Sequence, residues 1–149
     1  MTIAENVARV RERMEAAARR AGRDPGKVRL VAVSKTVDAA RIRQAIEAGV
    51  DLLGENYVQE AQKKVEELGH GAGWHFIGHL QSNKARVAVR LFDWVHSLDS
   101  LRLAEELNRA AQQQSRVLPV LLQVNLGQEA TKFGAQEDEV IRLLEKMAS

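Results

Sequence analysis

The stretch Val28-Arg29-Leu30-Val31-Ala32-Val33-Ser34 is an apolar run that predicts a buried β-strand, and Lys35 follows it directly. Similar runs recur along the chain at a spacing of about 20 to 24 residues, which fits one strand plus one crossover helix. These runs begin near Arg29, Leu52, His75, Val95 and Leu118. The repeat predicts parallel β/α units in series.

Helix signals lie before and between these runs. Thr2 and Glu5 have the spacing of a capping box, which predicts a first helix that ends at Gly22. Later helices are expected after Asp38, after Asn56 with Gln59 as its partner, and after Asp99 or Ser100, with a last helix from about Gln136 to Met147.

Residues 1–149 therefore predict a single α/β domain with an N-terminal helix. Two architectures accept five such units: an open doubly wound sheet, or the first five strands of an eight-stranded TIM-type barrel. The length favours the open sheet, because a complete barrel needs about 250 residues.

The composition excludes several function classes. The chain is 45% hydrophobic and 28% charged, and its 22 Lys and Arg against 20 Asp and Glu leave a net charge of +2. That balance provides no broad cationic field for nucleic acid or an anionic membrane. The absence of cysteine excludes disulfides and thiolate metal sites. No apolar segment suits a signal peptide or membrane span, so a cytoplasmic protein is expected.

Polar residues follow each of the five predicted strands. The ends of parallel strands share one edge of a sheet, and binding residues of α/β proteins gather there. The candidates are Lys35, Asn56, His79, Ser97 and Asn125. Lys35 is a Schiff-base candidate, because a partly buried lysine has a lowered pKa and exposes the neutral amine that attacks an aldehyde.

The local sequences around these residues carry a resemblance. The motifs are Val31–Thr36, Gly54–Glu60, Trp74–Lys84, Val95–Ser100, and Gln123–Asn125 with Lys132–Gly134. Together they resemble the pyridoxal phosphate homeostasis protein family, known as YggS in bacteria and PROSC in animals. That resemblance implies the barrel fold of the alanine racemase N-terminal domain, and so favours the barrel over the open sheet.

The resemblance also implies a function. It implies a protein that holds pyridoxal 5′-phosphate (PLP) as a Schiff base on Lys35, with Asn56 and His79 at the cofactor ring and Ser97 and Asn125 on the same wall. The family is regarded as acting in cofactor homeostasis without established catalytic turnover, so no catalytic residue is assigned. Tyr57 is the nearest candidate for a second acid or base, and we expect it to be packed.

The chain departs from the family in length. A family barrel has three more strands, whose loops supply the phosphate-binding residues, so we expect a truncated barrel. The glycine-rich Gly69–Gly73 precedes a strand, which places it at the opposite edge from Lys35. Unpaired edges at the first and fifth strands predict self-association, which a monomer in light scattering would contradict.

Other functions stay open. A Schiff-base lysine also suits a class I aldolase or an amino-acid racemase. The basic residues Lys84, Arg86 and Arg90, with Lys63 and Lys64, could contact RNA or a partner protein. His75 and His79 are four residues apart but lie in strand-like sequence without further ligands, so no metal site is predicted.

Overall fold

The computed structural model describes residues 1–149 and contains one parallel sheet with the strand order β1-β2-β3-β4-β5. Its strands are β1 (Ala32–Val33), β2 (Leu52–Glu55), β3 (Gly73–Phe76), β4 (Trp94–Leu98) and β5 (Val120–Leu122). Doubly wound sheets reverse their strand order at a switch point, whereas barrel strands follow chain order. The observed strand order therefore identifies a barrel-type sheet and not a doubly wound one. The predicted parallel α/β fold is confirmed.

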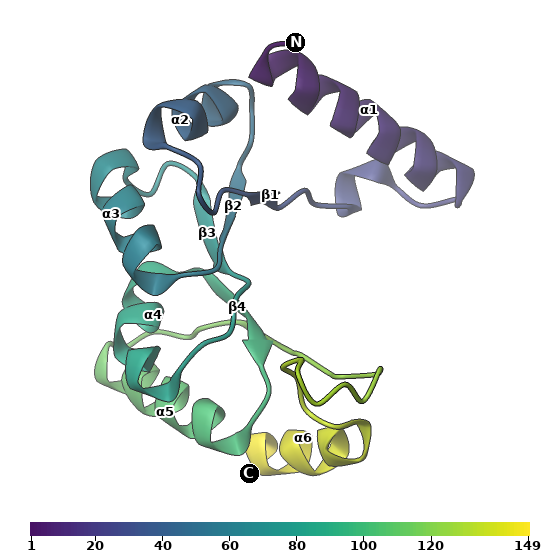
Figure 1. Ribbon diagram of the computed structural model, residues 1–149. Helices are drawn as coiled ribbons and strands as arrows, with labels where there is room; N and C mark the ends of the chain where they lie inside the picture. The colour runs from purple at the N-terminus through teal and green to yellow at the C-terminus, as the bar shows by residue number, and fades with distance from the viewer.

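The helices lie mainly on one side of this sheet. They are α1 (Ile3–Arg20), α2 (Ala39–Glu47), α3 (Val58–Leu68), α4 (Ala85–Leu91), α5 (Leu101–Gln113) and α6 (Val140–Ala148), with short 3₁₀ turns η1 (Pro25–Lys27), η2 (Ser82–Lys84) and η3 (Glu137–Glu139). In Figure 1, α2 to α5 follow one another in an arc beside the strands, while α1 and α6 lie at the two ends. The arrangement is part of a barrel wall.

Most predicted helix starts are confirmed. Thr2 and Glu5 form the capping box of α1, and the Asp38 side chain accepts a hydrogen bond from the Arg41 backbone N–H at the start of α2. Ser100, and not Asp99, caps α5.

Two helix starts differ from the prediction. The residue before α3 is Tyr57, without a side-chain cap, so the expected cap at Asn56 is wrong. The Ile77 N–H donates to the Glu55 carbonyl at 2.9 Å, so the pairing of β2 with the chain after β3 reaches the residue just before Asn56. The last helix begins at Val140, after the 3₁₀ turn η3, and not at Gln136.

The two faces of the sheet differ. The helix face carries the core, in which Leu53, Trp74, Phe76 and Val95 are each at most 1% exposed. We call the other side the inner face. Gly54 belongs to the inner face, because it follows Leu53 in β2 and successive strand residues point to opposite faces. The space beside it is filled, since a Cβ on Gly54 would be 3.0 Å from Ile77 Cδ1 and 3.1 Å from Val31 Cγ1.

Both edge strands of the sheet lack a neighbour on their outer side. β1 pairs only with β2, and β5 pairs with β4, with one further bridge between Val124 and Ala135 just beyond β5. Self-association through these edges stays a prediction. No helix of the chain has the length and apolar character needed to cross a membrane.

Candidate functional site

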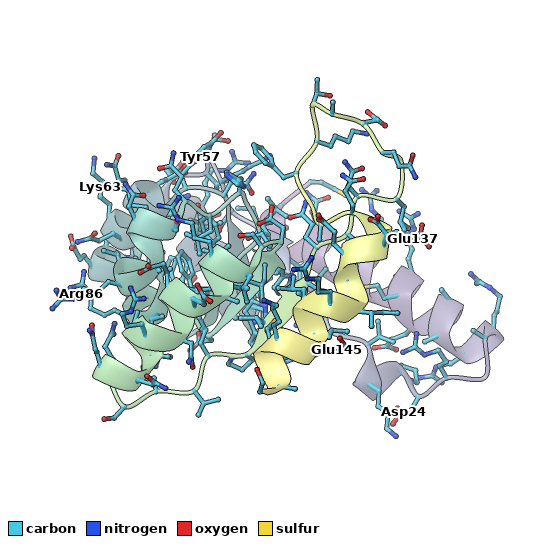
Figure 2. The ribbon with its side chains drawn as sticks, turned by 90° about the horizontal axis from the view of Figure 1, so that it is seen from below. Asp24, Tyr57, Lys63, Arg86, Glu137 and Glu145 are labelled. Carbon is cyan, nitrogen blue, oxygen red and sulfur yellow. The ribbon has the colours of Figure 1, made fainter.

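The carboxyl ends of the strands meet at one edge of the sheet. Figure 2 shows Tyr57, just after β2, at the same edge as the loop that leads from β5 to α6, whereas Asp24, before β1, lies at the opposite edge. The residues that follow the strands therefore share one side of the molecule, as the sequence predicted.

Lys35 is exposed at this edge, so the partial burial expected from the sequence is not observed. Val33 is paired with Gly54 across β1 and β2. Lys35 and Asn56 each lie two residues beyond this pair, after the ends of two neighbouring strands. Neighbouring strands are about 5 Å apart, so the two backbones are close.

Asn56 and His79 line the same groove, whose volume is about 770 Å³. The His79 ring stacks on Phe133, with ring centres 3.7 Å apart and planes 11° from parallel. The polar part of the lining also includes Tyr57, Gln59, Gln81, Lys84 and Gln123. Tyr57 is 61% exposed, so the expectation that it is packed is wrong.

Asn125 lines an adjoining groove that shares Gln123 and Phe133 with the first. Its side-chain amide donates to the carbonyls of Glu129 at 2.9 Å and Lys132 at 3.4 Å. Asn125 therefore holds together the loop that carries Phe133.

Ser97 and Lys35 line neither of these two grooves. Ser97 is 1% exposed, and its hydroxyl oxygen has no hydrogen-bond partner. A buried hydroxyl without a partner costs free energy. Of the five candidates, the structure brings Asn56 and His79 together in one groove and sets Asn125 beside them.

Gly78 shapes this groove by close contact with Asn56. A Cβ on Gly78 would lie 2.3 Å from the Asn56 carbonyl oxygen and 2.7 Å from its Cα, both backbone atoms. Gly78→Ala should therefore separate the ends of β2 and β3 and lower the free energy of unfolding by about 1–3 kcal/mol in urea titrations. Gly71→Ala is the matched control, because nothing lies within 4 Å of its Cβ position. Equal effects of the two substitutions would contradict this account.

A buried charged network lies on the helix face behind the strand ends. Lys64 Nζ donates to Glu55 Oε1 at 2.8 Å, to Glu60 Oε1 at 2.6 Å and to the Ser34 carbonyl at 2.6 Å. The Ser34 hydroxyl donates to Glu55 Oε1 at 2.5 Å. Glu55 is 0% exposed and Lys64 only 7%.

This network was missed from the sequence. Lys64 was grouped with Lys63 as an exposed basic residue for RNA or a partner, and that grouping is wrong, because only Lys63 is exposed. The signal that could have found it is the i,i+4 spacing of Glu60 and Lys64 on a helix that follows a strand ending in a carboxylate.

Glu60 is held in its ionised form by this network. The hydrogen bond from Lys64 lowers the pKa of Glu60, and a hydrogen bond from the Thr36 backbone N–H lowers it further, while burial opposes both. Thr36 N lies 2.6 Å from Glu60 Oε1. Glu60 therefore links α3 to the loop that contains Lys35.

A histidine pair lies between β3 and β4. His75 Nδ1 is 2.9 Å from His96 Nε2, and the His75 ring stacks against Trp94. Burial lowers the pKa of both histidines, and the neighbouring His96 lowers that of His75 further. His75 thus pairs with His96 and not with His79, and no group of three or more potential ligand side chains is placed to hold a metal ion.

The histidine pair predicts a pH dependence of stability. The unfolded chain takes up protons near the ordinary histidine pKa of 6.5, whereas the folded pair resists protonation. The contribution of the histidine pair to the free energy of unfolding is therefore fully present above pH 6.5. It is lost as the pH falls through the lowered pKa values of the folded pair. The drop in unfolding free energy from about pH 7.5 to about pH 5.5 should be smaller in His75→Gln than in wild type. The exposed His70→Gln should keep the wild-type drop; a drop in His75→Gln as large as in wild type would refute the assignment.

Known proteins share this fold. The model of the alanine racemase N-terminal domain family matches residues 4–149. The chain belongs to this family. The pyridoxal phosphate homeostasis protein of Escherichia coli (strain K12) is 47% identical over 150 residues, which cover 98% of this chain and 64% of that protein. This chain thus spans 64% of the length of that relative.

Two solved structures resemble the fold closely. PipY of Synechococcus elongatus, solved with PLP bound, is 41% identical, has a TM-score of 0.84 and is matched over 99% of this chain and 65% of its own. An unknown protein from Bifidobacterium adolescentis is 37% identical, with a TM-score of 0.91 over 99% of this chain and 64% of its own. These relatives confirm the family resemblance and the partial barrel predicted from the sequence.

Proposed function

We propose that this chain binds PLP, acts in the homeostasis of that cofactor, and holds it covalently on Lys35. The observation that carries the proposal is an exposed primary amine just beyond β1, at the strand end next to the one that Asn56 of the Asn56–His79 groove follows. The names of the relatives support the cofactor, since they include pyridoxal phosphate homeostasis proteins and a PLP-bound PipY.

The residues present fit one part of such a ligand. The groove combines a stacked imidazole and phenyl pair, suited to a flat aromatic ring, with neutral amides that can donate to ring oxygens. When bound, PLP would supply an aldehyde, with which the neutral amine of Lys35 would form one C=N bond with release of one water molecule. In this proposal Asn56 and His79 orient the ring, and Asn125 forms the adjacent wall. That Ser97 shares this wall stays a prediction, since its side chain is buried and lines neither groove.

We also propose that the site works as a carrier without catalytic turnover. Relatives carry the name of homeostasis proteins and not of enzymes. Racemisation needs an acid or base opposite the lysine. Tyr57, the candidate of suitable type, borders the groove but has most of its surface in solvent. The predicted cytoplasmic location stays a prediction.

Colour distinguishes the carrier from the alternative, a Schiff-base aldolase. Titration of the chain with PLP should produce a visible absorbance band that differs from that of free PLP and saturates at one equivalent. A chain that stays colourless with PLP while it cleaves an aldol substrate would refute the carrier and favour the aldolase.

A further inference from the structure

Lys35 lies in a tight turn with an unusual backbone. The Val37 N–H donates to the Ser34 carbonyl at 3.1 Å, so Lys35 and Thr36 are the two central residues of the turn. Thr36 has a φ of 61°, in the left-handed region that β-branched residues avoid. Such a conformation persists only where surrounding contacts enforce it.

Those contacts come from two residues one helical turn apart on α3. Lys64 Nζ donates to the carbonyl of Ser34, the residue before Lys35. The backbone N–H of Thr36, the residue after Lys35, donates to the Glu60 carboxylate. Lys64 and Glu60 also bond each other at 2.6 Å, so both peptide flanks of Lys35 are attached to one rigid unit.

Glu55 anchors that unit from the sheet. Its Oε1 accepts from both Lys64 and the Ser34 hydroxyl, and the carboxylate is fully buried. Buried ion pairs add little net stability, because desolvation offsets their attraction, and one use of such pairs is to specify a single geometry. The network bonds the backbone on both sides of Lys35 and leaves the side chain of Lys35 exposed.

We infer that Glu60 and Lys64, anchored by Glu55, are positioning residues that fix the turn of Lys35 so that its amine meets an aldehyde in one orientation. This inference rests on the proposed function of Lys35. A turn held in its reactive geometry loses less conformational freedom when the ligand couples, which favours both the rate and the affinity of coupling.

Glu60→Ala tests the inference with little risk to folding, because Glu60 lies at the partly exposed end of the network. Loss of a hydrogen bond to a charged group should raise hydrogen exchange at the Thr36 amide, and slow the coupling of PLP to Lys35, by about tenfold or more each. Glu60→Gln keeps an acceptor oxygen, so its hydrogen exchange at the Thr36 amide and its rate of PLP coupling should lie between those of wild type and Glu60→Ala. Glu67→Ala is the matched control on the same helix, since its exposed carboxylate forms one long ion pair, with Arg43 at 3.9 Å.

Two measurements distinguish a failure of the positioning role from a failure of the proposed function. Stopped-flow absorbance with PLP follows coupling, and hydrogen exchange of the PLP-free chain follows the turn. If wild type and Glu60→Ala couple at the same rate, the positioning role is overturned while the proposed function stands. If the wild-type chain never couples, the proposed function is overturned, and the role assigned to Glu60 and Lys64 falls with it.

Discussion

Lys64→Met is expected to lower the free energy of unfolding by about 3–5 kcal/mol, because it leaves the charge of Glu55 buried without its partner. Glu55 is 0% exposed, and its second oxygen accepts no hydrogen bond from another group of the protein, so the ammonium group of Lys64 supplies the main compensation for its charge. The substitution also removes the donor to the Ser34 carbonyl. Urea or thermal unfolding measures the effect.

Lys63→Met is the matched control, because the neighbouring Lys63 is exposed on the same helix. It should change stability by no more than about 0.5 kcal/mol. The double substitution Glu55→Met with Lys64→Met should recover part of the loss, since it removes both buried charges. If Lys64→Met and Lys63→Met had the same free energy of unfolding, the predicted contribution of the network to stability would be contradicted.

Lys35→Ala is expected to abolish covalent PLP binding completely, and Lys35→Arg should do the same. Alanine has no nucleophile, and a guanidinium group keeps the positive charge but stays protonated at neutral pH. Residual binding without the covalent bond should be weaker by at least about tenfold. Absorbance titration and mass spectrometry of the intact chain measure the two effects.

Lys63→Ala serves as the control for surface lysines that react with aldehydes nonspecifically. It removes an exposed amine from α3 and should leave both the spectrum and the stoichiometry of the wild type unchanged. A Lys35→Ala chain that keeps the wild-type visible band would contradict the assignment of Lys35.

The strands and most helix starts could be predicted from the sequence because their signals are local. Apolar runs and helix caps are properties of adjacent residues, so the five strands, the capping box at Thr2 and the cap at Asp38 could be predicted. The choice between an open sheet and a barrel depends on strand order, which periodicity does not encode. Only the motif resemblance favoured the barrel, and the strand order decided it.

The candidate site was harder to predict because burial is a tertiary property. Lysines are usually exposed, so nothing at Lys64 itself indicated that it is the buried one and Lys35 the exposed one. The stacking of Phe133 on His79 likewise depends on a loop from the far end of the sheet. Residue type at a strand end predicts which edge a side chain occupies, but not what it contacts.

The most direct test of the account is to fix the bound cofactor to its lysine and locate it. The wild-type chain is mixed with PLP, reduced with borohydride, digested and mapped by mass spectrometry. The account predicts a single pyridoxyl group on Lys35. A pyridoxyl group on another lysine in its place, or none at all, would contradict the central claim.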